Sequence, residues 1–176
     1  MHLAYVTAKE RGATDACLAE AVALLAGSGL RLAGGVQSSA DRPGRDTCDM
    51  DLTLLPGGPT LRISQDLGPM AEGCRLDADA LETAVAEVQR RLPGAQALVV
   101  NKFGKQEQIG RGFVPLIAQA LEAGLPVLVG VNAMNLTAFL EFAGDIGVAL
   151  PSDPNLAADW LRTACTAPVW LDPQSA

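Results

Sequence analysis

Short continuous runs of apolar residues alternate along this chain with segments whose apolar residues recur every three or four positions. A continuous run is typical of a strand buried on both faces, and the longer spacing is typical of an amphipathic helix. The predicted strands cover residues 3–6, 30–36, 97–100, 127–131 and 146–150. The predicted helices cover residues 14–25, 79–91, 115–123 and 135–142, with a last one from residue 154. The alternation predicts a three-layer α/β fold, in which helices cover both faces of a mostly parallel sheet of five or six strands.

Capping residues mark where several of these helices are expected to begin. Thr14 or Asp15 is suited to cap the first helix, and Asn135 is suited to cap a short helix in the second half. Asp79 is followed by Glu82 three positions later, which is the spacing of a capping box.

The middle of the chain is less regular. Residues 50–64 contain the turn sequence Pro-Gly-Gly-Pro at positions 56–59. This pattern predicts a hairpin, and hence a small antiparallel insertion in the sheet. No repeat, linker or low-complexity stretch divides the sequence, so residues 1–176 are expected to form a single domain.

The composition argues against several classes of protein. Apolar residues make up 49% of the chain and charged residues 19%, which argues against intrinsic disorder. The net charge of −7 offers no basic face to nucleic acid, and no apolar stretch approaches the roughly 20 residues of a membrane-spanning helix. Four scattered cysteines without a CxxC pair fit reduced thiols better than a disulfide framework. We therefore expect a cytoplasmic protein without nucleic-acid binding or membrane insertion, and so apolar a domain is expected to self-associate.

A first candidate site follows the first predicted strand, because ligands of open α/β sheets bind beyond the carboxyl ends of the strands. Residues 7–15 occupy the place of a phosphate-binding loop, whose sequence GxxxxGK[ST] supplies backbone N–H groups, a lysine and a Mg²⁺-binding hydroxyl. This segment has one glycine, Gly12, and no Gly-Lys-Ser/Thr, so a plain connection between strand and helix is the alternative. The N–H groups of the following helix favour an anion, which Asp15 opposes unless it is the cap.

A second segment carries two of the three lysines of the chain. Lys102 and Lys105 follow Asn101 at the carboxyl end of a predicted buried strand. Positive charge concentrated at this position favours an anion or phosphate site. Glu107 and Arg111 follow with a spacing of four, so the alternative is a solvated loop with a surface ion pair.

Polar residues in the irregular middle are further candidates for ligand contacts. Ser64 and Gln65 follow a predicted strand, and the guanidinium of Arg75 suits two-point contact with a phosphate. The alternative for Arg75 is an ion pair with Asp77, which then caps the next helix.

A metal site is not predicted. Cys48, Asp49 and Asp51 lie close together, with Cys74 further along, but their spacing matches no zinc signature and His2 is the only histidine. His2 precedes the first strand, away from the expected site, which argues against a Ser-His-Asp or Cys-His hydrolase.

Several motifs together resemble a bacterial family of unknown function, whose members are often encoded beside molybdate ABC transporters. The motifs are VVNKFGKQE at 99–107, GRGF at 110–113, GLPVLVGV at 124–131, ISQDLG at 63–68, GCRLD at 73–77, GVQ at 35–37 and CDMDL at 48–52. The resemblance extends from Leu3 to about Val148. It implies a link to molybdenum metabolism or transport.

That family is in turn similar to the small P-loop nucleoside triphosphatases, as a divergent branch. Those proteins have Asp-Glu-x-Gly-Lys-x-Glu where this chain has residues 101–107, so Asn101 and Lys102 replace the Walker B carboxylates. The resemblance places the Walker A lysine and hydroxyl at about Thr14 and Asp15, where neither residue type is kept. It therefore implies a degenerate P-loop fold and the position of its pocket, without a standard Mg-ATP site.

Three hypotheses of function follow. The first is a non-hydrolysing protein that binds a small anion, either a molybdate-type oxyanion or a phosphorylated small molecule. Its candidate contacts are the cations Lys102, Lys105, Arg75 and Arg111, the neutral groups Ser64, Gln65, Gln37 and Asn101, and the loop residues Thr14 and Asp15. The second is a divergent nucleoside triphosphatase or nucleotide-binding protein. In the enzyme, Lys102 replaces the missing P-loop lysine, and Asp15 or Glu107 handles metal or water. The third is a partner-binding subunit of a molybdenum enzyme or transporter.

Overall fold

The computed structural model describes residues 2–40, 49–65 and 76–166, and within them one seven-stranded sheet runs through the molecule. Its strand order is β4-β3-β2-β5-β6-β1-β7. The strands are β1 (Leu3–Val6), β2 (Leu32–Ala40), β3 (Asp49–Leu55), β4 (Thr60–Arg62), β5 (Ala97–Phe103), β6 (Val127–Val131) and β7 (Gly147–Leu150). The five strands β2, β5, β6, β1 and β7 are each parallel to their neighbours within this group. In contrast, β3 is antiparallel to both β2 and β4. The predicted mostly parallel sheet and its antiparallel insertion are confirmed, and the hairpin raises the number of strands above the five or six expected.

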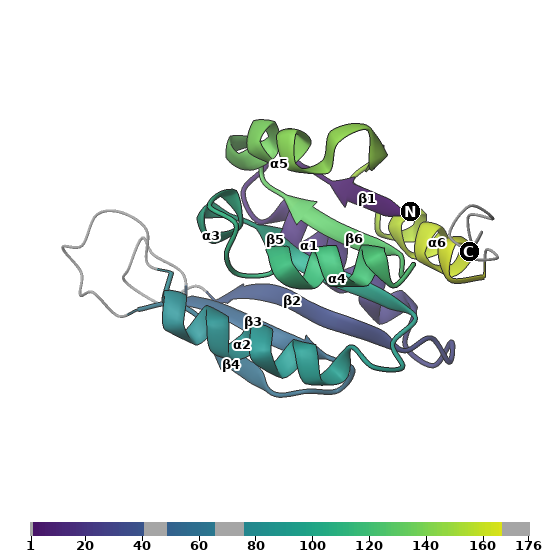
Figure 1. Ribbon diagram of the computed structural model, residues 1–176, viewed down its shortest axis with the longest axis horizontal. Helices are drawn as coiled ribbons and strands as arrows, with labels where there is room; N and C mark the ends of the chain where they lie inside the picture. The colour runs from purple at the N-terminus through teal and green to yellow at the C-terminus, as the bar shows by residue number, and fades with distance from the viewer. Residues whose placement is uncertain (1, 41–48, 66–75, 167–176) are drawn as a thin grey trace, which may run out of the picture.

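Helices cover both faces of this sheet (Figure 1). They are α1 (Ala13–Leu24), α2 (Ala78–Arg91), α3 (Lys105–Gln108), α4 (Val114–Glu122), α5 (Leu136–Ala143) and α6 (Pro154–Thr166), with the short 3₁₀ helices η1 (Ala133–Asn135) and η2 (Gly144–Ile146). The helices α2, α4 and α5 pack on one face, and α1 and α6 pack on the other. Among the described helices, none combines the length and the apolarity that a bilayer crossing requires.

The continuous apolar runs of the strands build two core layers, because successive side chains of a strand point to opposite faces. In β5, Leu98 and Val100 pack in the layer of α2 and α4, while Ala97 and Val99 pack in the layer of α1 and α6. All four side chains are fully buried. Burial on both sides explains why these strands show no alternation of apolar and polar residues.

The first helix does not begin as its capping residues suggested. Gly12 is the N-cap of α1, and its φ of 79° lies in the left-handed region that favours glycine. Neither Thr14 nor Asp15 caps the helix, because both lie inside its first turn. The Asp15 side chain is thereby left to contact β5.

The start of α2 also differs from the predicted capping box. The Asp77 carboxylate accepts hydrogen bonds from the backbone N–H groups of Asp79 and Ala80, at 3.1 and 3.0 Å. The helix therefore begins at Ala78, and the assignment of Asp79 as cap with Glu82 as its partner is wrong. The alternative, in which Asp77 caps this helix, is confirmed.

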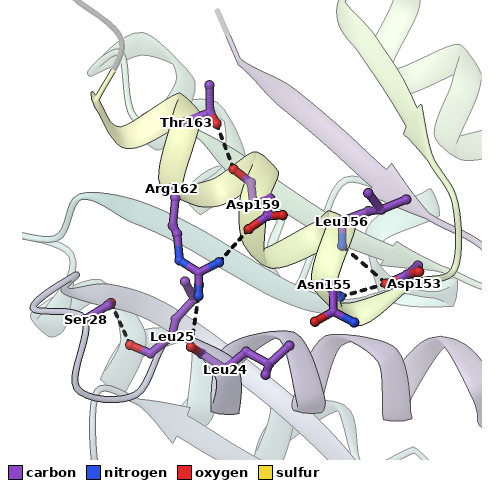
Figure 2. A network of polar contacts seen from close by, with 9 residues as sticks. All are labelled: Leu24, Leu25, Ser28, Asp153, Asn155, Leu156, Asp159, Arg162 and Thr163. Atoms are coloured by element: carbon purple, nitrogen blue, oxygen red, sulfur yellow. Dashed lines mark hydrogen bonds and ion pairs between the residues drawn. The ribbon is translucent and has the colours of Figure 1, made fainter.

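The last helix, α6, makes polar contacts at its start and near its end (Figure 2). Asp153 Oδ1 accepts a hydrogen bond from the N–H of Asn155 at 2.8 Å, which caps the first turn of α6. Arg162 pairs with Asp159 at 2.6 Å and donates to the carbonyl of Leu24, the last residue of α1, at 3.1 Å. The hydrogen bond from Arg162 to Leu24 therefore joins α6 to α1, which packs on the same face of the sheet.

A substitution at Leu128 tests whether β6 lies at the centre of the core. The Leu128 side chain is fully buried, so Leu128→Ala should lower the free energy of unfolding by about 2–5 kcal/mol through lost burial and the cavity left behind. Val148→Ala on the edge strand β7 is the control, since Val148 is 53% exposed and should lose much less. Urea unfolding measures both, and similar losses for the two variants would contradict the strand order.

Candidate functional site

The carboxyl ends of three strands meet at one edge of the sheet. Gly130 of β6 is paired with Val6 of β1 on one side and with Asn101 of β5 on the other. The loop of residues 7–12 therefore lies close to the end of β5, on the side of the sheet where Figure 1 shows α3. This is the edge at which the sequence predicted a ligand.

The connection between β1 and α1 has the spacing of a phosphate-binding loop but lacks its lysine. Gly12 takes the place of the second glycine of GxxxxGK[ST], because α1 begins directly after it. The lysine and hydroxyl positions then fall on Ala13 and Thr14, one residue earlier than the sequence suggested. The Thr14 hydroxyl is buried and accepts a hydrogen bond from the N–H of Ala8 at 3.1 Å. The loop thus retains a hydroxyl at this position and has no charge on the residue before it.

The first turn of α1 leaves backbone N–H groups available, as helix N-termini do. The N–H of Ala13 donates to the Glu10 carbonyl at 3.2 Å, and the N–H of Ala16 donates to the Gly12 carbonyl at 2.9 Å. Within the described residues, no backbone acceptor serves the amides of Thr14 and Asp15. These two groups and the helix dipole favour negative charge at this end of α1.

The Asp15 carboxylate is buried between α1 and β5, and each of its oxygens meets a donor. Only 7% of Asp15 is exposed. Its Oδ1 accepts from Nδ2 of Asn101 at 2.9 Å, in the amide orientation that also lets Asn101 accept from the backbone N–H of Gln37 at 3.0 Å. Its Oδ2 lies 3.4 Å from Nζ of Lys102. A polar network therefore joins β2, β5 and α1 at this edge.

Lys102 brings a positive charge to the first turn of α1 from the neighbouring strand. Its side chain is 27% exposed while the ammonium group pairs with Asp15. Asn101 is only 1% exposed, and both polar atoms of its amide are engaged within the network. Lys102 is thus partly exposed at this edge, whereas Asn101 is buried and orients Asp15.

Gly130 provides the space in which this network fits. A Cβ added at this position would lie 3.0 Å from the side-chain amide of Asn101 and 3.2 Å from Cγ2 of Thr14. Few real Cβ atoms have contacts this short. The side chains of Asn101 and Thr14 therefore come this close to β6 because Gly130 has no side chain.

A second buried carboxylate, that of Glu107, shapes the loop after β5. Its Oε2 accepts from the N–H of Gly104 at 2.9 Å, and its Oε1 accepts from the N–H of Phe113 at 3.0 Å. Burial raises the pKa of Glu107, the backbone hydrogen bonds oppose that shift, and the charge of Glu82 adds to it. Because both of its oxygens accept from backbone N–H groups, Glu107 connects Gly104 with Phe113 and fixes the loop between them.

The two remaining cations of this segment that the structure describes stay at the surface. Lys105 begins α3 and Arg111 lies in the following loop, and both are exposed. Within the described residues, neither one forms an ion pair with a carboxylate. The alternative reading, a surface ion pair of Glu107 with Arg111, is wrong, because Glu107 turns inward to the backbone of the loop.

Among the other candidates, Ser64 lies apart from Asp15. Ser64 is buried and accepts from the N–H of Met50 in β3, two strands away from β5. Gln37 is buried in β2 and joins the network through its backbone, while Gln65 is exposed. Arg75 is outside the described residues.

The acidic residues of β3 form ion pairs with an arginine of β4. Arg62 forms ion pairs with Asp49 at 2.7 Å and with Asp51 at 2.5 Å. Cys48 and Cys74 lie outside the described residues. In the part of the chain that the structure covers, no group of three or more His, Cys, Asp or Glu side chains is arranged to hold a metal ion.

Two residues at this edge have roles that the sequence did not suggest. Glu82 of α2 accepts from the N–H of Gly112 at 3.0 Å, so it supports the same loop as Glu107. Asn135 is the N-cap residue of α5, as predicted, but its side chain makes no capping hydrogen bond. It donates instead to the Phe103 carbonyl at 3.0 Å and accepts from Gln108 at 2.6 Å. Both residues thus fix the backbone after β5.

Two glycines of this loop give a matched test of the Glu107 contact. An added Cβ at Gly112 would lie 2.1 Å from Oε1 of Glu107, whereas one at Gly110 would have nothing within 4 Å, although both residues have positive φ. Gly110→Ala should lose about 1–2 kcal/mol from its backbone conformation. Gly112→Ala should lose a further 1–3 kcal/mol or so from the clash. Chemical unfolding measures both, and equal losses would contradict a closely packed Glu107.

Solved structures of nucleoside triphosphatases share this fold. The solution structure of a human cancer-related nucleoside triphosphatase is similar with a TM-score of 0.66 and 19% identity, over 95% of this chain and 98% of that one. The crystal structure of THEP1 from the hyperthermophile Aquifex aeolicus is similar with a TM-score of 0.60 and 12% identity, over 93% of this chain and 99% of that one. These likenesses show that the chain has the P-loop nucleoside-triphosphatase fold.

Similarity in sequence extends to one segment of a transport protein. The chain is 34% identical over 149 residues to molybdenum import ATP-binding protein ModC 2 of Bradyrhizobium diazoefficiens. The matched segment is 84% of this chain and 17% of that relative, so the chain spans about a sixth of its length. Residues 3–160 match the model of the family described as "Protein of unknown function (DUF2478)", and the chain belongs to this family.

Proposed function

We propose that this chain binds a phosphate-type anion between the β1–α1 loop and the end of β5, and that it does so without the hydrolysis of a standard P-loop site. The observation that carries the proposal is the position of Lys102, whose Nζ lies 3.4 Å from Asp15 Oδ2 in the first turn of α1. Lys102 therefore brings a positive charge to the N-terminus of α1, where a standard phosphate-binding loop has a lysine and this loop has Ala13.

The backbone around Lys102 supports this reading. The amides of Thr14 and Asp15 have no backbone acceptor within the described residues, and the N-terminus of α1 favours negative charge. An ammonium group has three donors, so Lys102 can bind an anion while it keeps its contact with Asp15. Donors from the backbone and from Lys102 would then face the same anion.

The loss of hydrolysis follows from the residues at the two Walker positions. Ala13 stands at the lysine position of the loop, and Asn101 stands where the Walker B sequence has a carboxylate. Phosphoryl transfer depends on Mg²⁺ and on positive charge that stabilises the transition state. A neutral amide that is already engaged with Asp15 and Gln37 offers no such metal ligand.

The ligand class is either a molybdate-type oxyanion or a phosphorylated small molecule such as a nucleotide. The molybdenum import protein with a similar segment supports the first, and the shared fold with nucleoside triphosphatases supports the second. Molybdate and a phosphate group are both tetrahedral and negatively charged, and N–H donors can form hydrogen bonds to the oxygens of either.

A divergent nucleoside triphosphatase is the second candidate. It is favoured by the Thr14 hydroxyl, which falls at the position that binds Mg²⁺ in a standard loop, and by the Asp15 carboxylate beside it. A third candidate is an accessory subunit of a molybdenum enzyme or transporter. It is favoured by the molybdenum import ATP-binding protein, because the segment of that protein that is similar to this chain makes up only 17% of its length.

Titration of the protein with inorganic phosphate, ATP and molybdate tests the first proposal. Isothermal calorimetry should detect binding of at least one of them, and Lys102→Ala should weaken it about ten- to a hundred-fold, since a charge-assisted hydrogen bond contributes about 1.5–3 kcal/mol. Arg90→Ala near the far end of α2 removes one positive charge elsewhere and should leave the affinity nearly unchanged. Unchanged affinity in Lys102→Ala would place the anion elsewhere.

Hydrolysis assays separate the first proposal from the second. The protein should show no Mg²⁺-dependent release of phosphate from ATP, and Thr14→Ala should make no difference to that result. Turnover that requires Mg²⁺ and disappears in Thr14→Ala or Asp15→Ala would favour the triphosphatase. Absence of binding to every anion would favour the accessory subunit.

A further inference from the structure

We infer that Asp15 makes the proposed site selective for an anion that still carries a proton. Such anions are inorganic phosphate, a phosphate monoester or the terminal phosphate of a nucleotide. Molybdate and sulfate carry no proton at neutral pH. The inference rests on the proposed function, because it names the ligand class of the same site.

The geometry limits the distance between the Asp15 carboxylate and any anion that Lys102 binds. Lys102 Nζ lies 3.4 Å from Asp15 Oδ2. An anion oxygen that accepts a hydrogen bond from the same ammonium lies about 3 Å from it, and hence no more than about 6.5 Å from the Asp15 carboxylate. Two negative groups therefore share one cation.

The carboxylate is held in this position by the rest of the network. Asp15 is 7% exposed, and its other oxygen accepts from Asn101 at 2.9 Å. Asn101 is itself fixed by the backbone N–H of Gln37 at 3.0 Å. The Asp15 side chain is thus restrained from turning into solvent when an anion arrives.

The chemistry of the two partners decides which anion is accepted. An ionised carboxylate only accepts hydrogen bonds, and so does a fully deprotonated tetrahedral oxyanion. Their oxygens repel each other, and neither can donate. A phosphate monoester has a second pKa of about 6, so its protonated form is available near neutral pH and can donate its O–H to Asp15. The same carboxylate thereby repels molybdate and binds phosphate.

Calorimetry with the full chain in EDTA at pH 7 tests the inference, because removal of divalent cations prevents a metal ion from replacing the proton. The probes are inorganic phosphate, methyl phosphate, sulfate and molybdate. The wild-type protein should bind the two phosphates at least ten-fold more tightly than sulfate and molybdate. Asp15→Asn should reduce this preference by about ten-fold or more, since an amide donates as well as accepts. Asp159→Asn on α6 removes an equal charge from an exposed side chain and should keep the wild-type preference.

The outcomes separate the inference from the proposed function. Equal affinity of the wild-type protein for phosphate and molybdate would overturn the inference and leave anion binding intact. A phosphate preference that persists in Asp15→Asn would overturn the role of Asp15. No binding of any probe would remove the proposed function and the inference together. The wild-type preference can be measured even where Asp15→Asn fails to fold.

Discussion

A carboxylate that is withdrawn from water needs donors or an opposite charge close by, and the edge of this sheet provides both for Asp15. Asn101 donates to one of its oxygens, and Lys102 lies beside the other. The two partners come from β5 and the carboxylate comes from α1, so the contact depends on the adjacency of β1, β6 and β5 in the sheet. The partly exposed cation at the edge, and with it the proposed site, follows from this one arrangement.

A similar requirement shapes the segment after β5. Glu107 is buried by the loop that it holds, because its two oxygens accept from the N–H groups of Gly104 and Phe113. Glu82 supports the same loop from α2. The loop therefore depends on carboxylates for its own shape. A segment that looks rich in charge from its sequence presents outward mainly its cations, which suits an anionic ligand.

The sequence predicts the architecture well, since burial on both faces leaves a direct signature in the chain. Continuous apolar runs located β1, β5 and β6, and the Pro-Gly-Gly-Pro turn located the hairpin of β3 and β4. Helix caps were harder to predict, because one acidic residue can cap a helix or bind a partner distant in sequence. Asp77 rather than Asp79 caps α2, and Asp15 pairs with a lysine 87 positions away.

The site was predictable only in part. Lys102 was identified from its place at the end of a buried strand, and the structure brings it to the first turn of α1. The inward turn of Glu107 had only the surrounding glycines as a signal, such as Gly112, whose hydrogen atom faces the carboxylate where a side chain would clash. Spacing in the sequence offered an ion pair with Arg111 as an alternative, because spacing carries no information about burial.

The central claim is that an anion binds at the N-terminus of α1 beside Lys102. Amide chemical shifts of ¹⁵N-labelled protein, recorded during titration with inorganic phosphate, test it most directly because they report the place of binding residue by residue. The account predicts that the largest changes occur at Gly12, Ala13, Thr14, Asp15 and Lys102, with little change in α2 or α6. Saturable changes centred on another part of the molecule, or no changes at all, would contradict it.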